Sequence, residues 1–298
     1  MKFVCISFVS FICLIQVTTG SLQTMLSCGS GSLSGSMYST TLDGNPLFSN
    51  SPSLAVFMNG AWLSNSWVVT GASNVSGSDA LGQYTGTECS YSLSTNPAVT
   101  FLTTAAYTYP SADAAPESSI VRFRYSFPQG IKETNHSANK PATYSTVSNF
   151  PSFKGPNTPL KDILTWRDAF FGPSNNIPDS LGQIASTIVF FDGSDVASKA
   201  VVLSPLDVFL NAALGDDLGD GTACSGSDAG CWVGGVSATV TSLPPGFTQS
   251  YVLVSATGFT STVNAWGSVL RAYYGGTSSR LSDVSLSTLG YQTDNVSL

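Results

Sequence analysis

Hydrophobic and polar residues alternate with a period of two along most of the chain, from Ser21 to about Thr257. The clearest stretch is SIVRFRYSF at 119–127, where two arginines fall on one face and four large hydrophobic residues fall on the other. Such alternation is typical of β-strands that bury one face. The arginines are Arg122 and Arg124, and the hydrophobic residues are Val121, Phe123, Tyr125 and Phe127.

Further strand-length runs are rich in Val, Phe, Tyr and Thr, and clusters of Gly, Pro, Asn and Ser separate them. Such clusters favour turns, and many strands joined by turns predict stacked antiparallel sheets. The fold class we expect is mainly β: an antiparallel β-sandwich or supersandwich, without internal repeats. The expected strands lie in residues 54–63, 66–72, 98–109, 186–193, 199–206 and 249–258.

Two segments break this pattern and predict helices. Residues 159–172, PLKDILTWRDAFFG, begin with a proline suited to the first helical position and close at Gly172–Pro173. In residues 261–276, STVNAWGSVLRAYYGG, hydrophobic residues recur at helical spacing and two glycines end the run. That stripe consists of Val263, Trp266, Leu270 and Tyr273.

The first 20 residues have the order of a secretory signal: one lysine, an apolar stretch, then small residues. A membrane anchor is the alternative, but a spanning helix needs about 20 apolar residues, and this stretch ends at Val17. We expect cleavage after Gly20 and a secreted, extracellular protein without a membrane segment. N-x-S sequons at Asn74 and Asn135 fit this compartment and predict glycosylation in exposed loops.

Composition narrows the possible partners. Charged residues make up only 10% of the 298 residues and hydrophobic residues 42%, which argues against disorder. The net charge is −7, and no cluster of Lys and Arg is present to meet phosphates. Nucleic acids and anionic membranes are therefore poor partners, whereas a neutral saccharide is compatible with such a surface.

Signal removal would leave four cysteines, which in an oxidising compartment predict two disulfides. Cys224 and Cys231 enclose a short polar loop, so we pair them, which leaves Cys28 with Cys89. A zinc site is the alternative. It is disfavoured because no CxxC spacing occurs and His136, the only histidine, lies far away in a polar loop.

The most acidic segment, GDDLGDGTACSGSDAGC at 215–231, combines carboxylates with glycines, as a calcium loop requires. Its spacing does not match the pattern D-x-D-x-D-G, and no Glu stands at the twelfth position. We interpret it as an acidic surface loop closed by a disulfide, and we expect neither a metal nor a cofactor. Its acids are Asp216, Asp217, Asp220 and Asp228.

No constellation of residues predicts an active site. His136 is the only imidazole and lies inside a sequon, so a serine-hydrolase triad is not expected. Asp162 and Asp168 could pair for glycosidic cleavage, which needs two carboxylates, but the neighbouring Lys161 and Arg167 favour solvated ion pairs. We therefore assign no catalytic residue in this chain.

The C-terminal order of Trp266–Gly267, then YYGG, then LGYQTD with Asn295 resembles secreted eukaryotic glycoside-hydrolase-like proteins. In that group a W-G pair in a linker helix precedes a motif close to LGYxTDNGAYYYY. The group is loosely similar to the alpha-galactosidase and raffinose-synthase clan. The resemblance is sharp at residues 289–295, and SSIVRFRYSFPQG and SLPPGFTQSYVLVSATG also look like its sandwich segments.

This resemblance implies a β-supersandwich, a linker helix and then a (β/α)₈ barrel that carries the catalytic carboxylates. A barrel needs about 250 residues, so the chain would be truncated before it and inactive alone, with the missing barrel as an intramolecular partner. Leu289 to Tyr291 would form the first barrel strand, with Asp294 at its end as a substrate-binding residue. The implied parts are a signal peptide at 1–20, the β-supersandwich at 21–258, the linker helix at 259–278 and the start of the barrel at 279–298.

The last three residues depart from the family pattern. After Asn295 the family would continue with Gly, Ala and several Tyr, whereas this chain reads Val296, Ser297 and Leu298. A eukaryotic 5′ splice site commonly reads GTAAGT or GTGAGT, and both translate in frame as Val–Ser. We therefore interpret these residues as read-through into an intron.

Three readings of function stay open. The first is the N-terminal non-catalytic β-domain of a secreted glycoside hydrolase acting on O-glycosidic bonds, with an apolar patch where the barrel would pack. The second is a complete secreted protein that binds carbohydrate through exposed aromatics, and the third is a surface structural protein. The patch would lie near Trp266, Tyr273 and Tyr274, and the carbohydrate-binding candidates are Trp62, Trp67 and Trp232.

Overall fold

The structure is a computed structural model of the chain. It describes residues 21–28, 38–49, 54–64, 66–110, 115–136, 146–148, 150–156, 160, 162–167, 170–174, 187–192, 199–209, 212–215 and 231–276.

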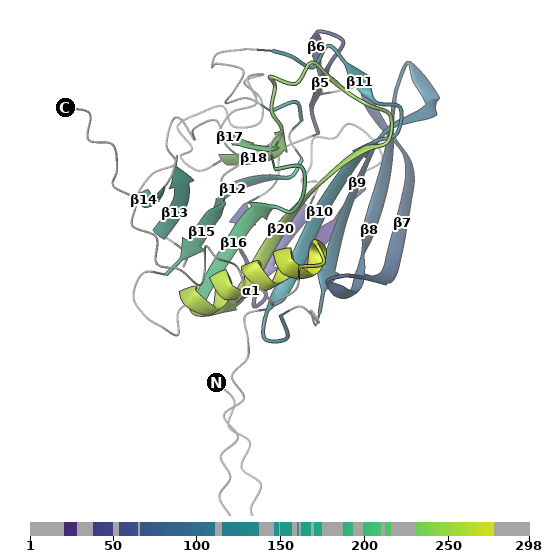
Figure 1. Cartoon of the computed structure of the whole chain (residues 1–298). Coiled ribbons are helices and arrows are strands. Elements are labelled where there is room, and N and C mark those ends of the chain that lie inside the picture. Colours follow the sequence, from purple (N-terminus) through teal and green to yellow (C-terminus); the bar gives the residue numbers. More distant parts are fainter. Residues whose placement is uncertain are drawn as a thin grey trace, which may run out of the picture.

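One large antiparallel sheet forms the centre of the fold (Figure 1). Its described strands are β7 (Trp67–Asp79), β8 (Gly82–Leu93), β9 (Asn96–Tyr109), β10 (Ser119–Phe127), β13 (Asp162–Arg167), β14 (Phe170–Ser174), β15 (Ile188–Phe191), β16 (Lys199–Pro205) and β20 (Phe247–Thr257). They run in the order β14-β13-β15-β16-β20-β10-β9-β8-β7, and each neighbouring pair is antiparallel.

Shorter strands pack against one face of this sheet, which we call the inner face. They are β1 (Leu22–Leu26), β2 (Tyr38–Leu42) and β3 (Asn45–Pro46); β4 (Phe48–Ser49), β12 (Ser152–Pro156), β17 (Ala212–Gly215) and β18 (Cys231–Val236); and the pairs β5 (Val56–Met58) with β6 (Ala61–Leu63) and β11 (Ile131–Lys132) with β19 (Ser242–Leu243). Aromatic rings join the two layers: the ring centroids of Phe153 on β12 and Phe123 on β10 are 5.5 Å apart. Burying each such ring contributes about 1.5–3 kcal/mol.

The opposite, outer face carries the helix α1 (Phe259–Tyr273), which lies across β16 and β20 (Figure 1). This third layer explains the unbroken apolar run in β20. Tyr251 and Leu253 belong to the inner core, whereas Val252 and Val254 pack with the helix residues Ala265 and Val269. A strand that is covered on both faces is expected to be apolar at successive positions.

The structure confirms the expected fold class: a mainly antiparallel β-sandwich with a C-terminal helix. The strand expected at 119–127 is β10, and its alternation places Val121, Phe123, Tyr125 and Phe127 in the inner core. The domain boundaries remain predictions, since residues 1–20 and 277–298 lie outside the described part.

The helix predicted at 159–172 is wrong, because this segment contains the strands β13 and β14, paired from Ile163↔Ser174 to Arg167↔Phe170. β13 also pairs with β15, so the sheet supplies backbone hydrogen bonds that a helix would make internally. Ile163, Thr165 and Phe170 are residue types that favour strands. The tertiary ladder therefore outweighs the helix-like spacing and the proline signal.

The second predicted helix is correct, and α1 runs from Phe259 to Tyr273. Its buried residues are Thr262, Ala265 and Val269, so the buried face is rotated from the predicted stripe. Trp266 and Tyr273 are half-buried at the edge of that face. The helix ends as expected, with the Gly276 N–H donating to the Arg271 carbonyl at 2.7 Å.

Candidate functional site

A polar network, the helix-end network, joins the C-terminal end of α1 to the outer face of the sheet. Its members are Asp79, Tyr109, Arg122, Asp207, Ser250 and Tyr273. Arg122 lies at the centre: its Nη1 is 3.1 Å from Asp79 Oδ2, and its Nε is 3.3 Å from Ser250 Oγ. Tyr109 also donates its hydroxyl to Asp79 Oδ2 at 2.8 Å.

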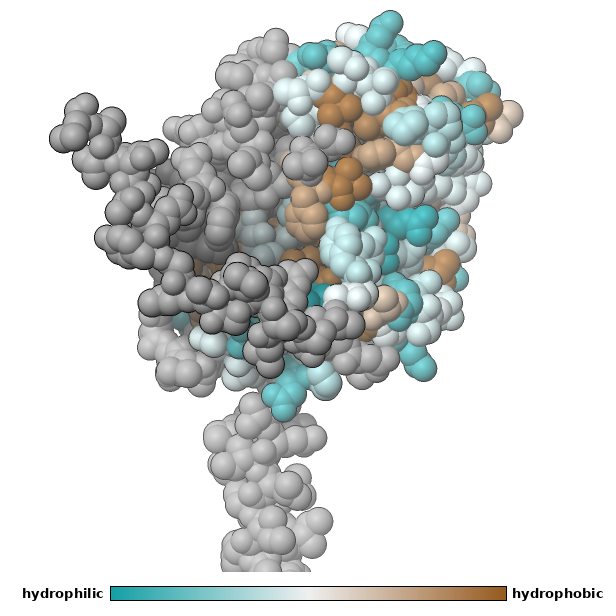
Figure 2. Space-filling view, viewed as in Figure 1, coloured by the Kyte–Doolittle hydropathy of each residue, from teal (hydrophilic) through white to brown (hydrophobic). Residues whose placement is uncertain are grey.

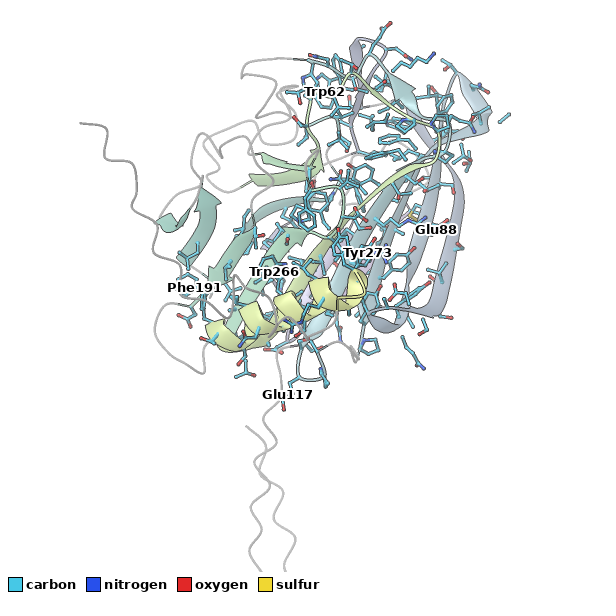
Figure 3. The ribbon with its side chains drawn as sticks, in the orientation of Figure 1. Trp62, Glu88, Glu117, Phe191, Trp266 and Tyr273 are labelled. Carbon is cyan, nitrogen blue, oxygen red and sulfur yellow. A yellow bond between two sulfur atoms is a disulfide. The ribbon has the colours of Figure 1, made fainter. Side chains whose placement is uncertain are left out.

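Tyr273 connects this network to the helix. Its hydroxyl donates to Asp207 Oδ2 at 3.0 Å, while Asp207 Oδ1 accepts the backbone N–H of Ser250 at 2.7 Å. The Cζ atom of Arg122 lies 5.5 Å from the centroid of the Tyr273 ring and 5.9 Å from that of Tyr107, which is cation–π distance. Figure 3 shows Tyr273 on α1 at the sheet face.

The electrostatics of the network keep its tyrosines neutral. Burial, with the Asp207 carboxylate as the next cause, raises the pKa of Tyr273 to about 12. Burial and the hydrogen bond to Asp79 raise the pKa of Tyr109 well above its usual value. Burial alone would lower the pKa of Arg122, but neighbouring Tyr109, Tyr273 and Asp79 raise it, so the guanidinium stays charged. The charged groups Arg122, Asp79 and Asp207 each have a hydrogen-bond partner. Polar groups that are paired in this way hold the structure around them in place.

The other end of α1 is also fixed. The Thr262 hydroxyl is fully buried, accepts the backbone N–H of Ala256 at 3.1 Å and donates to the Gly258 carbonyl at 2.8 Å. Gly258 has a φ of 84°, a left-handed conformation that glycine adopts without strain, and it turns the chain from β20 into the helix. The helix is therefore tied to the sheet at both ends.

Of the three residues named for the expected apolar patch, only Tyr274 is exposed, whereas Trp266 and Tyr273 are half-buried. Tyr274 is 57% exposed and Phe209 36%, and their ring centroids are 6.3 Å apart. Trp266 is half-buried on α1 (Figure 3), and its Nε1 is buried without a hydrogen-bond acceptor.

On the face viewed in Figure 2, hydrophobic residues stand among hydrophilic ones. The exposed residues of α1 itself are polar: Thr260, Ser261, Asn264 and Arg271.

Neither of the two described tryptophans considered as carbohydrate-binding candidates, Trp62 and Trp67, is an exposed ring. Trp67 is only 4% exposed, and its Nε1 donates to the Leu63 carbonyl at 2.7 Å. Trp62 is half-buried and lies edge-on to the Phe57 ring, far from α1 (Figure 3). The Trp232 side chain lies outside the described residues.

His136 is buried, at 8% exposure, so its expected place in an exposed polar loop is wrong, although the neighbouring Asn135 is exposed. Its Nε2 is 3.0 Å from the Thr146 carbonyl, and its Nδ1 has no partner. Burial lowers the pKa of His136, because a charged imidazolium would lose its hydration there. The ring packs on Phe57 and Trp62, as a core residue does.

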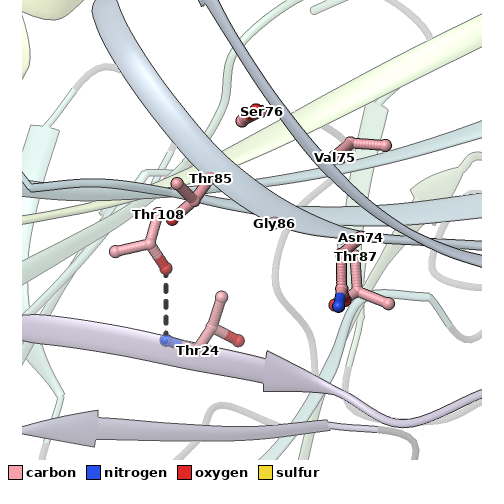
Figure 4. Close-up of a pocket in the computed structure, with 8 residues that line it drawn as sticks. All are labelled: Thr24, Asn74, Val75, Ser76, Thr85, Gly86, Thr87 and Thr108. Atoms are coloured by element: carbon pink, nitrogen blue, oxygen red, sulfur yellow. Dashed lines mark hydrogen bonds between the residues drawn. The ribbon is translucent and has the colours of Figure 1, made fainter.

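A polar cleft of about 410 Å³, the threonine cleft, opens between β1 and the strands β7, β8 and β9 (Figure 4). The Thr24 N–H donates across it to Thr108 Oγ1 at 3.4 Å. Its lining has no charged side chain and consists of Thr24, Asn74, Val75, Ser76, Thr85, Gly86, Thr87 and Thr108.

The disulfide expected between Cys28 and Cys89 is present and ties the segment after β1 to β8. Several other expectations lie outside the described residues: Cys224, Asp168, Asp294, the acids at 216–228 and the strand at 289–291. Among the described residues, no group of three or more His, Cys, Asp or Glu could hold a metal ion. No described helix is long and apolar enough to span a membrane.

Sequence reasoning did not identify the helix-end network. Arg122 and Arg124 were correctly placed on the face opposite the inner core. What it did not reveal is that α1 and the residues that follow β16, Leu206 and Asp207, cover part of that face. The available signal was the run YVLV in β20, the neighbour of β10, because a strand apolar at successive positions needs cover on both faces.

No protein-family model matches the chain, and no curated protein matches it significantly. Among solved structures, it is similar to an alpha-N-acetylgalactosaminidase from Bifidobacterium bifidum in complex with GalNAc (8% identity, 92% of this chain, 40% of that chain, TM-score 0.41). A glycoside hydrolase family 97 enzyme from Pseudoalteromonas sp., in complex with acarbose, aligns at 13% identity over 80% of this chain and 35% of that chain, with a TM-score of 0.38.

The galactosidase domain of an alpha-galactosidase–sucrose kinase aligns at 8% identity over 73% of this chain and 32% of that chain, again with a TM-score of 0.38. The chain thus spans well under half the length of these glycoside hydrolases. With TM-scores this low, the likeness carries no conclusion about what the chain does.

Proposed function

We propose that this chain is the N-terminal, non-catalytic β-domain of a secreted glycoside hydrolase that acts on O-glycosidic bonds. The observation that carries the proposal is the fixation of α1 at both ends, by Thr262 at one and by Tyr273 at the other. A helix held in this way gives the segment that follows it a fixed starting point. The resemblance at residues 289–295 implies a linker helix between the β-domain and the barrel. A helix fixed at both ends would connect these two domains rigidly.

In this proposal the catalytic barrel follows α1 and packs beside its C-terminal end. Phe209 and Tyr274 form the exposed aromatic pair there, and an interface between domains would bury such residues. The substrate is a carbohydrate, bound by the barrel. Asp294 belongs to the substrate-contacting part, at the end of the first barrel strand.

The test compares two secreted proteins: the 298-residue chain and the product of a longer transcript that includes a barrel. We expect the longer product to hydrolyse aryl glycosides and the short chain to hydrolyse none. A longer product without glycosidase activity, or turnover by the short chain, would contradict the proposal.

A variant pair tests the packing. Phe209→Ser should destabilise the longer product by about 1–2 kcal/mol more than it destabilises the short chain, because only the longer product would bury this ring. Met25→Ser is the matched control, since Met25 is 71% exposed on β1, away from α1. Equal effects of Phe209→Ser on the stability of both proteins would show that Phe209 does not lie in the interface.

A further inference from the structure

The threonine cleft contains all three residues of one sequon, Asn74, Val75 and Ser76 (Figure 4). The sequence pattern predicted this sequon in a loop, but it lies within β7, at the edge of the large sheet. β7 is paired on one side only, to β8, so its side chains are reachable from solvent at that edge. The sequon is therefore part of the lining of the cleft.

The strand orients the sequon toward the cleft. Val75 is half-buried and packs with the outer-face core, whereas Asn74 and Ser76 are exposed. Because side chains alternate along a strand, Asn74 and Ser76 share the other face. Thr87 Oγ1 donates to Asn74 Oδ1 at 3.4 Å, which leaves the amide nitrogen Nδ2 free of that contact. Nδ2 is the atom that N-glycosylation modifies.

The floor and wall of the cleft carry hydroxyl groups in register. Thr87 is opposite Asn74, Thr85 is opposite Ser76, and Thr108 is opposite Thr85 on the next strand. Hydroxyls can both donate and accept hydrogen bonds, as a sugar requires, and the lining is uncharged. Gly86 lets the strands approach closely, since a Cβ there would lie 2.2 Å from the Ala106 carbonyl oxygen.

The far wall is held in place by β1. The Cys28–Cys89 disulfide fixes the chain just after this strand to β8, and the Thr24 N–H bonds to Thr108. The hydroxyl of Thr24 is committed to the Ser39 carbonyl at 3.2 Å. The cleft is thus formed before any ligand arrives, which lowers the entropic cost of ordering a sugar in it.

We propose that Asn74 carries an N-linked glycan and that the threonine cleft holds its first sugar, an N-acetylhexosamine. In the transfer, Asn74 Nδ2 forms a bond to C1 of the sugar of a polyprenyl-diphosphate-linked oligosaccharide. The bond from C1 to the diphosphate oxygen breaks, the amide loses one proton, and the polyprenyl diphosphate leaves. The inference is independent of the proposed glycosidase role and requires only entry into a secretory pathway.

The experiment uses the full 298-residue chain secreted from eukaryotic cells, with glycopeptide mass spectrometry to establish occupancy of Asn74. Release by peptide-N-glycosidase is then timed on native and denatured protein. In the Asn135→Gln/Asn295→Gln double variant, which leaves Asn74 as the remaining N-x-S sequon, native release should be at least about tenfold slower than denatured release, equivalent to about 1.4 kcal/mol. In the Asn74→Gln/Asn295→Gln double variant, which leaves Asn135 as the remaining N-x-S sequon, the rates of native and denatured release should differ less.

A substitution in the cleft gives a second readout. Thr85→Val removes one lining hydroxyl and should accelerate native release from Asn74, whereas Thr70→Val, on β7 outside the cleft, should leave it unchanged. An unmodified Asn74 in the secreted protein would overturn the proposal. Equal release rates from native and denatured protein would overturn the assignment of the cleft, even if Asn74 is occupied.

Discussion

Arg122 illustrates at the residue scale how a charge is accommodated on a covered sheet face. Its side chain is 14% exposed, and it is hydrogen-bonded to both Asp79 and Ser250. A charge removed from water is tolerated where partners replace the lost hydration. The period-two pattern placed Arg122 on the correct face. It could not show that this face is covered, because cover depends on a helix more than 130 residues later in the chain.

Replacing Arg122 should therefore destabilise the fold. Arg122→Met keeps much of the apolar stem but leaves Asp79 without its cation, and we expect a loss of about 2–4 kcal/mol in the free energy of unfolding. Arg124→Met, on the same face of the same strand, should cost less than about 1 kcal/mol. Urea unfolding of both variants measures these losses in the free energy of unfolding. Similar losses in the two would show that the network adds nothing.

The network also predicts a loss of stability at high pH. The pKa of Tyr273 is raised from 10.0 to about 12, so the folded state retains a proton that the unfolded chain releases earlier. Its contribution is complete below pH 10 and is lost as the pH rises from 10 through 12. Unfolding free energies across this range should fall less steeply in Tyr273→Phe than in the parent. Parallel curves for the two proteins would contradict the assignment.

At the element scale, the two predicted helices show which sequence signals distinguish a helix from a strand. In residues 261–276 the helical spacing agreed with C-terminal glycines, and α1 forms there. In residues 159–172 the spacing competed with Ile163, Thr165 and Phe170, and the strands β13 and β14 form beside β15. Spacing in a short apolar segment does not distinguish a helix from a strand, because the pairing partner lies elsewhere in the sequence.

Thr262 should be the most sensitive polar position of α1. Thr262→Val keeps the shape of the side chain but leaves the Ala256 N–H and the Gly258 carbonyl without its hydroxyl, at an expected cost of about 1–3 kcal/mol. Ser261→Ala, at the adjacent exposed position, should stay within about 0.5 kcal/mol of the parent. Thermal and urea unfolding would report both values. A neutral Thr262→Val would mean that apolar packing alone fixes the helix.

At the scale of the whole molecule, alternation and turn chemistry were sufficient to predict a mainly β sandwich. The order of the strands in the sheet was not predictable, because β10 pairs with β20 across more than 100 residues of sequence. The same limit applied to the candidate site: Asp79, Arg122 and Asp207 come from distant segments and meet only after the sheet forms. The cysteine pairing of Cys28 with Cys89 followed from spacing and compartment alone.

The central claim is that this β-domain belongs to a longer glycoside hydrolase, and sequencing the transcript across the codon for Asn295 tests it most directly. We predict an in-frame continuation into Gly and aromatic residues, followed by a barrel of about 250 residues. A transcript that ends after Leu298 would contradict the claim.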